Sequence, residues 1–233
     1  MPVTETGQGG TLARTHEGLP GLPRGRSRLP LSAVRALQRE RLLRSVIAAV
    51  SESGYLAVTV ADIVRRARVS RAAFYAHFAD KEDCFLAATA EGRELMIGQV
   101  LSAARALPPG SRDEEVLRVA CRAYLAFLAA EPAFARVFFI HMPTAGPRAV
   151  DRLDAAARLF AELNQKWHQR AREHHPEWPS VPPETYVGLV GATDALVRSM
   201  VRAGRTHALP ELEGTLMSLH LAVLAARPWP AET

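Results

Sequence analysis

The chain has 233 residues, of which 48% are hydrophobic and 23% are charged, and its formal net charge is +5. This composition is typical of a soluble globular protein and excludes a wholly disordered chain. No apolar run reaches the roughly 18 residues that a membrane-spanning helix needs, and the N-terminus lacks the apolar core of a secretory signal. We therefore expect a cytoplasmic protein with no membrane partner.

The net positive charge of the chain comes from the first third of the sequence. Residues 1–33 hold four arginines against two glutamates, and residues 34–86 hold nine basic residues against six acidic ones. Residues 87–233 hold sixteen of each and are neutral. This distribution favours a polyanionic partner for the first part of the chain, although a few exposed arginines without function would produce the same count.

Glycine and proline content separates a short N-terminal segment from the rest. Both residues recur without a period through residues 1–33, which predicts a disordered basic tail. From residue 34 onward the pattern is helical, and no alternating strand pattern occurs. We expect an all-α protein, with a three-helix domain at residues 34–86 and a larger helical bundle at residues 87–233.

The predicted helices follow from apolar residues at helical spacing and from capping residues at the helix ends. Thr59 with Asp62 and Ser111 with Glu114 are predicted capping boxes, and Gly54 suits the end of the first helix. In chain order, the helices are expected over residues 32–53, 60–66, 71–77, 80–106, 111–130, 132–141, 147–174, 184–203 and 210–227.

Two short helices separated by three or four residues, the second capped by Ser70, are typical of a helix-turn-helix. The second helix of this motif lies in the major groove of DNA. Ala72 and Ala73 are small enough to let it approach the bases closely. The side chains that would face the DNA are Arg71, Tyr75 and His77.

The sequence around these helices carries a more specific pattern. It reads GYLAVTVADIV from Gly54, VSRAAFYAHF from Val69 and DKE from Asp80. Over about residues 39–87 the chain resembles the N-terminal domain of the TetR family of transcriptional regulators. It departs from the family at Arg68, where the family usually has glycine. A non-glycine residue there takes either the left-handed conformation or a different turn.

The resemblance implies a homodimeric repressor that binds a palindromic operator in double-stranded DNA. In the family, the helical C-terminal domain forms the dimer and binds a small-molecule effector, which releases the operator. Position by position, Thr59, Tyr75 and Lys81 match phosphate-contacting positions, and His77 matches a further backbone contact. The base-reading start of the recognition helix corresponds to Ser70, Arg71 and Ala72.

An effector pocket is expected within the helical bundle. Aromatic residues at helical spacing are more often core than ligand-binding, so each candidate has both interpretations. Asp194 could pair with a cationic or hydroxyl group of a ligand, or bridge to an arginine. The modest expectation is an apolar, fairly bulky effector with one or two polar groups. The candidate ligand-binding residues are Tyr124, Phe127, Phe138, His141, Phe160, Trp167, Tyr186 and Asp194.

The last two long predicted helices fit the family's dimer interface, a four-helix bundle made from two copies. Their apolar residues could also pack inside one subunit, and Gly188, Gly191 and Ala195 would permit close approach of another helix. The apolar residues are Val187, Val190, Leu196 and Val197 on one helix, and Leu216, Leu219, Leu221, Val223 and Leu224 on the other.

The N-terminal arginines also have two interpretations. Arg24, Arg26 and Arg28 lie just ahead of the first helix. They could enter the minor groove, as N-terminal arms do in other DNA-binding proteins. They could equally belong to a tail that only increases solubility.

No catalytic residue, metal site or cofactor is expected. His168, His174 and His175 lack the spacing of metal ligands and are expected to be exposed. The chain contains no glycine-rich phosphate loop, nucleophile elbow or His-Glu-x-x-His motif. We therefore expect no enzyme. The alternative to a DNA-binding regulator is a helical module that binds a small molecule or a protein, with weak or no DNA binding.

Overall fold

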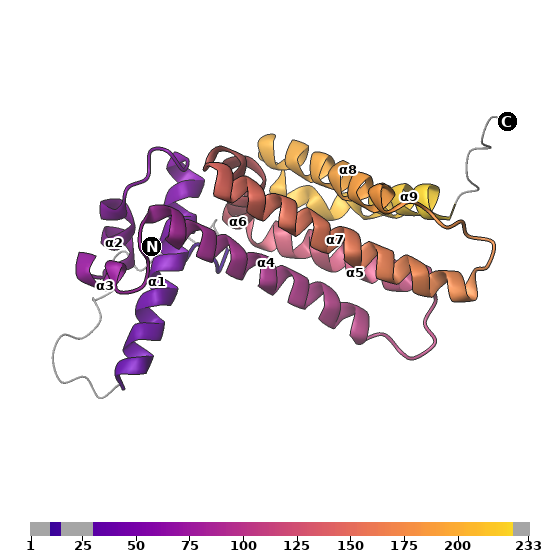
Figure 1. Ribbon diagram of the computed structural model, residues 1–233, viewed down its shortest axis with the longest axis horizontal. Helices are drawn as coiled ribbons and strands as arrows, with labels where there is room; N and C mark the ends of the chain where they lie inside the picture. The colour runs from indigo at the N-terminus through magenta and orange to yellow at the C-terminus, as the bar shows by residue number, and fades with distance from the viewer. Residues whose placement is uncertain (1–9, 15–29, 226–233) are drawn as a thin grey trace, which may run out of the picture. The chain divides into compact units, whose positions relative to one another are not determined.

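The computed structural model describes residues 10–14 and 30–225, and these residues form helices and connecting turns without any strand (Figure 1). The predicted all-α fold is confirmed. The chain divides into two compact units. Unit 1 comprises the residues up to Leu95 together with Ala130–Val150, and unit 2 comprises Met96–Ala129 together with the residues from Asp151 onward.

Unit 1 is built around the helix α1, Leu31–Ser53. Leu42, Val46 and Ile47 on its inner face are buried, together with Phe74 and Phe85 from later helices. Burial of such side chains contributes about 1.5–3 kcal/mol each to the free energy of unfolding. The other elements of unit 1 are α2 (Val60–Ala67), α3 (Arg71–Tyr75), the first part of α4 (Lys81–Arg105), α6 (Pro132–Arg136), a π-helical turn (Val137–His141) and a 3₁₀ turn (Met142–Thr144).

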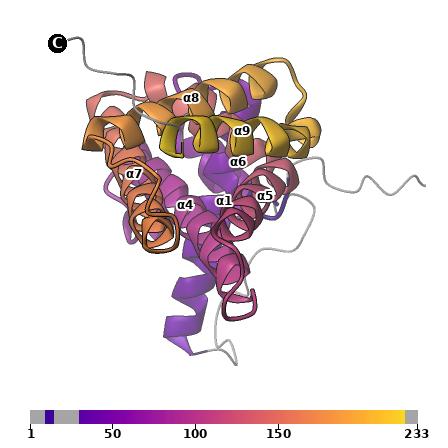
Figure 2. The same cartoon turned by 90° about the vertical axis from the view of Figure 1, so that its right-hand side faces the viewer.

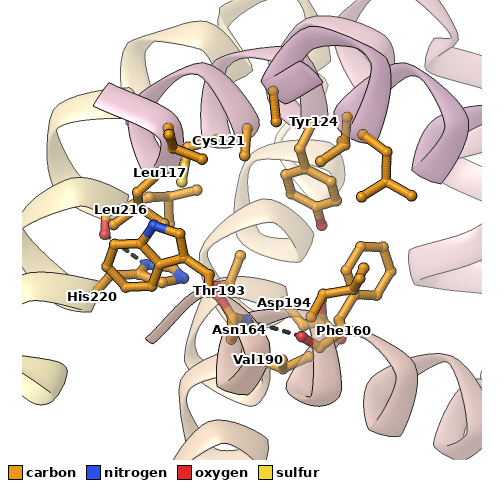
Figure 3. Close-up of a pocket in the computed structure, with 17 residues that line it drawn as sticks. Leu117, Cys121, Tyr124, Phe160, Asn164, Val190, Thr193, Asp194, Leu216 and His220 are labelled. Carbon is orange, nitrogen blue, oxygen red and sulfur yellow. Dashed lines mark hydrogen bonds between the residues drawn. The ribbon is translucent and has the colours of Figure 1, made fainter. Parts of the chain in front are cut away.

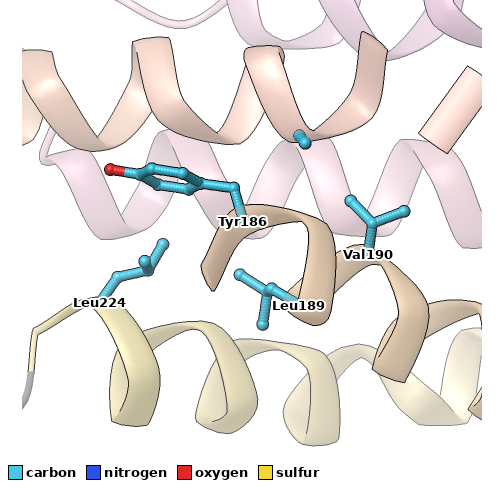
Figure 4. Packing of buried hydrophobic residues seen from close by; sticks show 5 residues of the cluster. Tyr186, Leu189, Val190 and Leu224 are labelled. Carbon is cyan, nitrogen blue, oxygen red and sulfur yellow. The ribbon is translucent and has the colours of Figure 1, made fainter. Parts of the chain in front are cut away.

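Unit 2 is a bundle of long helices. Seen end-on, α8 and α9 lie side by side, with α5 and α7 beneath them and the second part of α4 opposite (Figure 2). Tyr186, Leu189 and Val190 of α8 pack with Leu224 of α9 in a buried cluster (Figure 4). The elements are the end of α4, α5 (Asp113–Ala130), most of α7 (Pro147–His174), α8 (Pro183–Arg202), the 3₁₀ helix η3 (Thr206–Leu212) and α9 (Glu213–Leu224).

Two helix starts differ by more than one residue from the sequence prediction. The Ser111 hydroxyl donates to the Pro108 carbonyl at 2.8 Å, and α5 begins only at Asp113, so the predicted capping box with Glu114 does not form. Pro210 lies inside η3, and α9 begins at Glu213 rather than at Pro210. In both places the tighter local turn satisfies main-chain groups before the α-helix begins.

The prediction of a disordered tail does not hold for residues 10–14. The Thr11 main-chain N–H donates to the Glu131 carboxylate at 2.8 Å, and the Leu12 N–H donates to it at 2.9 Å. Gly10 has φ +76°, and a Cβ there would lie 2.7 Å from the Ala130 carbonyl oxygen. Arg24, Arg26 and Arg28 lie outside the described residues.

The histidines near the end of α7 are not uniformly exposed. His168 is fully buried, with Nδ1 2.8 Å from the Tyr186 hydroxyl, so the prediction of exposure was wrong for this residue. His174 Nδ1 lies 2.9 Å from the Asp113 carboxylate, and the His175 ring stacks on Trp178 at 4.5 Å. Residues 10–14 and 30–225 contain no group of three His, Cys, Asp or Glu side chains placed to hold a metal ion.

No single helix in the part of the chain that the structure describes is long and apolar enough to span a membrane. Two consecutive helical segments, Asp113–Ala130 and Pro132–Thr144, reach the length and the apolar composition of a membrane span only when they are counted together.

Candidate nucleic-acid interface and effector pocket

The start of α2 is held by a capping box. The Asp62 main-chain N–H donates to the Thr59 hydroxyl at 3.2 Å, and the Thr59 N–H donates to the Asp62 carboxylate at 3.0 Å. The Thr59 hydroxyl also donates to the Asp62 carboxylate, at 2.6 Å, and this bond, followed by the one from the Thr59 N–H, holds the pKa of Asp62 below its usual value. The exposed Thr59 side chain is thereby fixed at the positive end of the α2 dipole, a position that favours a phosphate oxygen.

The turn between α2 and α3 depends on Arg68. Its φ of +54° and ψ of +42° are in the left-handed region, and it is the one non-glycine residue with positive φ among those described. The Val69 N–H donates to the Val64 carbonyl at 3.2 Å, which closes the end of α2. The chain therefore keeps the turn that glycine would form and accepts the backbone strain of a larger residue.

One face of α3 is exposed. The Ser70 hydroxyl accepts a hydrogen bond from the Ala73 N–H at 3.0 Å and caps the helix. Arg71 and Ala72 are exposed, and the Tyr75 side chain is 52% exposed. Phe74 is fully buried on the opposite face, and its ring meets the Tyr75 ring edge-on at 5.3 Å. The helix thus presents arginine, alanine and tyrosine outward while phenylalanine anchors it to unit 1.

His77 and Lys81 are turned toward the protein. His77 is half-buried, and its buried Nε2 has no hydrogen-bond partner. Burial and the nearby Arg35 and Arg39 lower the pKa of His77. The Lys81 ammonium donates to the carbonyls of Tyr55 and Val58 at 2.8 Å each and lies 4.2 Å from the centre of the Tyr55 ring. Thr59, Ser70, Arg71, Ala72 and Tyr75 are therefore the exposed members of the predicted set.

Unit 2 contains a cavity of about 220 Å³ (Figure 3). All five long helices of the unit contribute to its wall, and most of the lining side chains are apolar. The lining residues are Val100, Leu101 and Ala104 of α4, Val116, Leu117, Ala120, Cys121 and Tyr124 of α5, Phe160, Leu163, Asn164 and Trp167 of α7, Val190, Thr193 and Asp194 of α8, and Leu216 and His220 of α9.

Burial shifts the pKa of several ionisable groups of the cavity, among them Asp194, Tyr124 and His220. Burial raises the pKa of Asp194 to about 6, and the opposing effect of Arg198 is smaller. Burial, followed by the charge of Asp194, raises the pKa of Tyr124 well above its usual value. Burial lowers the pKa of His220, whose Nδ1 donates to the Leu216 carbonyl at 2.7 Å. The Tyr124 hydroxyl points into the cavity (Figure 3).

Only half of the predicted ligand-binding residues line the cavity of unit 2. Tyr124, Phe160, Trp167 and Asp194 line the cavity. Phe127 is buried but does not line it, and Tyr186 packs in the cluster shown in Figure 4. Phe138 and His141 belong to the π-helical turn of unit 1 and are not part of this cavity.

The sequence prediction missed several polar lining residues, including Asn164, Thr193 and His220. Asn164 lies four residues after Phe160 and three before Trp167, so extending the aromatic face of α7 by helical spacing would have found it. Thr193 precedes Asp194 directly. His220 has no comparable local signal, because its exposure to the cavity depends on how α9 packs.

Residues 43–88 match the family model described as bacterial regulatory proteins, tetR family. The N-terminal helices therefore resemble a TetR-family domain. The match includes Arg68, whose left-handed conformation forms the turn between α2 and α3 without glycine. None of the curated proteins matches the sequence.

Solved structures of TetR-like regulators share the fold over most of both chains. The fatty acid degradation regulator FadR from Bacillus halodurans is 18% identical with a TM-score of 0.72, and the match covers 82% of this chain and 97% of FadR. FadR from Bacillus subtilis, in complex with stearoyl-CoA, is 15% identical with a TM-score of 0.70 and coverage of 81% and 99%. A TetR-like transcriptional regulator from Rhodococcus sp. RHA1 is 23% identical with a TM-score of 0.62 and coverage of 86% and 100%.

Proposed function

We propose that this protein is a homodimeric DNA-binding repressor that recognises a palindromic operator and is released from it by a small, largely apolar effector. The observation that carries this proposal is the exposed face of α3 within a TetR-family helix-turn-helix. Its capping, its buried Phe74 and its outward Arg71 and Tyr75 fit a helix that enters the major groove. With DNA as the partner, a cytoplasmic location follows from the proposed function.

Each candidate residue has a proposed role on DNA. Arg71 reads base edges, where a bidentate arginine–guanine contact contributes about 1–3 kcal/mol of discrimination. Ser70 and Ala72 flank Arg71 at the start of α3. Thr59, Tyr75, His77 and Lys81 contact the phosphate backbone, and for His77 and Lys81 this requires their side chains to turn from their present partners toward solvent. In this proposal residues 34–86 are the DNA-binding domain and residues 87–233 the effector-binding and dimerisation domain.

The exposed face of α8 supports dimerisation. Val187 is 48% exposed, and Gly188, Gly191 and Ala195 lie on the same exposed face. A Cβ placed on either glycine would have no neighbour within 4 Å, so another helix could approach the backbone there. By contrast, Val190, Val197, Leu216 and Leu224 are buried within one subunit and are not available to a partner.

The cavity of unit 2 supports an effector. It is lined mainly by apolar groups with a few polar ones, the arrangement typical of small-molecule sites. A structural neighbour, FadR from Bacillus subtilis, is known in complex with stearoyl-CoA. We therefore place the effector between α4, α5, α7, α8 and α9.

Fluorescence anisotropy with labelled duplex DNA tests the proposal. The probe is the intergenic DNA beside the protein's own gene, and the control is a random duplex of equal length. We expect selective binding that saturates at one dimer per site, and an affinity that falls steeply with salt because phosphate contacts release counterions. A matched pair, Arg71→Ala and the surface change Arg112→Ala in unit 2, separates the α3 contact from overall charge.

Weak binding without sequence preference, to this DNA and to operators selected from random duplexes, would contradict the proposal. That result would favour the alternative function, a helical module that binds a small molecule or a protein through unit 2. The cavity is the observation that keeps this alternative open, since it does not depend on the DNA-binding helices.

A further inference from the structure

The polar groups of the unit 2 cavity are unevenly divided between hydrogen-bond donors and acceptors. Among the lining residues that the structure describes, Asp194 is the one acid, and none is lysine or arginine. A ligand that enters this cavity therefore meets a carboxylate with no opposite charge on the wall beside it.

The Asp194 carboxylate is half-buried and has no ion pair or hydrogen bond with any described residue. Arg198, one turn further along α8, is exposed, and its effect on Asp194 is smaller than that of burial. Removing an ionised carboxylate from water without a partner is unfavourable. A cationic group bound in the cavity would supply the partner that the chain does not.

The donors of the cavity wall are largely occupied by main-chain carbonyls. The Asn164 amide donates to Phe160 at 3.1 Å, and the Thr193 hydroxyl donates to Leu189 at 3.0 Å. The Trp167 indole donates to Asp113 at 3.1 Å. His220 donates through Nδ1 to Leu216, which leaves its neutral Nε2 as an acceptor.

The Tyr124 hydroxyl lies within the electrostatic influence of Asp194 and points into the same space (Figure 3). Because the pKa of Tyr124 is raised, the hydroxyl keeps its proton, and its oxygen is able to accept a hydrogen bond. The cavity therefore offers an ionisable carboxylate, a phenol oxygen and an imidazole nitrogen as acceptors, surrounded by apolar side chains.

We propose that the effector is a small apolar amine whose protonated nitrogen pairs with the Asp194 carboxylate and lies within reach of the Tyr124 hydroxyl. This inference rests on the proposed function, because it assigns a ligand chemistry to the same cavity. An amine effector would distinguish this protein from regulators that bind fatty acids or acyl-CoA. Asp194 would repel the anionic groups of those ligands. The cavity of about 220 Å³ is below the roughly 300–1,000 Å³ typical of drug-sized ligands, which favours a short chain.

Three series of ligands with matched chains test the head group. Hexyl, octyl and decyl chains are used as the primary amine, the alcohol and the carboxylic acid, and binding to the full-length protein is measured by calorimetry at about pH 7.5. We expect at least one amine to bind at least about tenfold more tightly than the acid of the same length, since the Asp194 carboxylate attracts an ammonium group and repels a carboxylate.

Two variants assign this preference to Asp194. Asp194→Asn should lower the affinity for the amine by about 10–100-fold, with a much smaller change for the alcohol. Glu184→Gln removes an exposed charge from the same helix and should change neither affinity. Circular dichroism establishes that both variants are folded.

Three results would overturn the inference. They are failure of all three amines to bind, tighter binding of the acids than of the amines, and an unchanged amine affinity in folded Asp194→Asn. DNA release separates this inference from the proposed function. If an acid binds best and releases operator DNA, the proposed regulatory function stands and the inference of an amine effector is wrong. If the protein binds an amine but no DNA, the inference about the cavity stands and the proposed regulatory function is wrong.

Discussion

Thr11 and Glu131, 120 residues apart in the chain, are joined by two hydrogen bonds. The Thr11 main-chain N–H donates to Oε1 at 2.8 Å and its hydroxyl donates to the same oxygen at 2.5 Å. The Leu12 N–H binds the other carboxylate oxygen at 2.9 Å. Glu131 is buried and immediately precedes α6, so the N-terminal segment is tied to the start of that helix.

Glu131→Ala should lower the free energy of unfolding by about 1–3 kcal/mol. The substitution leaves the Thr11 and Leu12 donors without their partner, and such donors cost about 1–3 kcal/mol when water does not replace the acceptor. Urea denaturation measures the change. Glu211→Ala, which removes an exposed pair with Arg205, should cost about 0–1 kcal/mol. Equal stability of the two variants would show that the N-terminal contact contributes nothing.

Tyr75→Ala should weaken operator binding about tenfold and leave stability nearly unchanged, because more than half of the side chain is exposed. Tyr75→Phe separates the hydroxyl from the ring. Leu95→Ala, which truncates a 50% exposed side chain elsewhere in unit 1, is the matched control for DNA affinity. Anisotropy titrations give the affinities and thermal denaturation gives the stabilities. Operator affinity equal to the parent protein in Tyr75→Ala would remove Tyr75 from the contact surface.

Arg68→Gly should stabilise the protein by up to about 1 kcal/mol. A left-handed conformation costs a non-glycine residue about 1–2 kcal/mol, and the greater flexibility of glycine in the unfolded chain offsets part of the gain. Arg65→Gly, inside α2, should have the opposite sign because glycine destabilises a helix interior. Chemical denaturation of both variants provides the comparison. A loss of stability in Arg68→Gly would mean that the Arg68 side chain makes a stabilising contact.

Asp194 should make stability depend on pH. Its folded pKa of about 6 lies above its usual 3.8, so the folded state binds the proton more tightly than the unfolded state. Stability is therefore higher below pH 4 than above pH 6, and this contribution is lost as pH rises through that window. Because the side chain is partly exposed, we expect the free energy of unfolding to change by about 2 kcal/mol, which is less than the pKa shift alone would correspond to.

Asp194→Asn should consequently be more stable than the parent protein at pH 7.5, and the difference should shrink toward pH 4. The other ionisable groups facing this carboxylate are the Arg198 guanidinium and Tyr124, whose raised pKa keeps its hydroxyl protonated in this range, while the lining residue His220 remains in both proteins. Thermal denaturation of both proteins from pH 4 to 8 measures the difference. A constant difference across this range would show that Asp194 keeps an ordinary pKa.

The helix-turn-helix could be predicted because its signals are local. Thr59 and Asp62, or Ser70 and Ala73, are three residues apart and bond within one helical turn. Phe74 and Phe78 are four residues apart, so helical spacing places both on the same face, and both are buried. The roles of the exposed residues on DNA stay predictions, as do the domain boundaries.

The sequence by itself thus determined the all-α fold, the capped helix α3 and most helix bounds, because hydrogen bonds and side-chain contacts three or four residues apart determine these features. Only the tertiary structure decided which residues share a cavity, since Tyr124, Phe160 and Asp194 come from three helices and meet through packing. It also decided that Lys81 turns to the carbonyls of Tyr55 and Val58, and that Thr11 binds Glu131. Such contacts depend on how distant segments fold together, and no local sequence pattern specifies them.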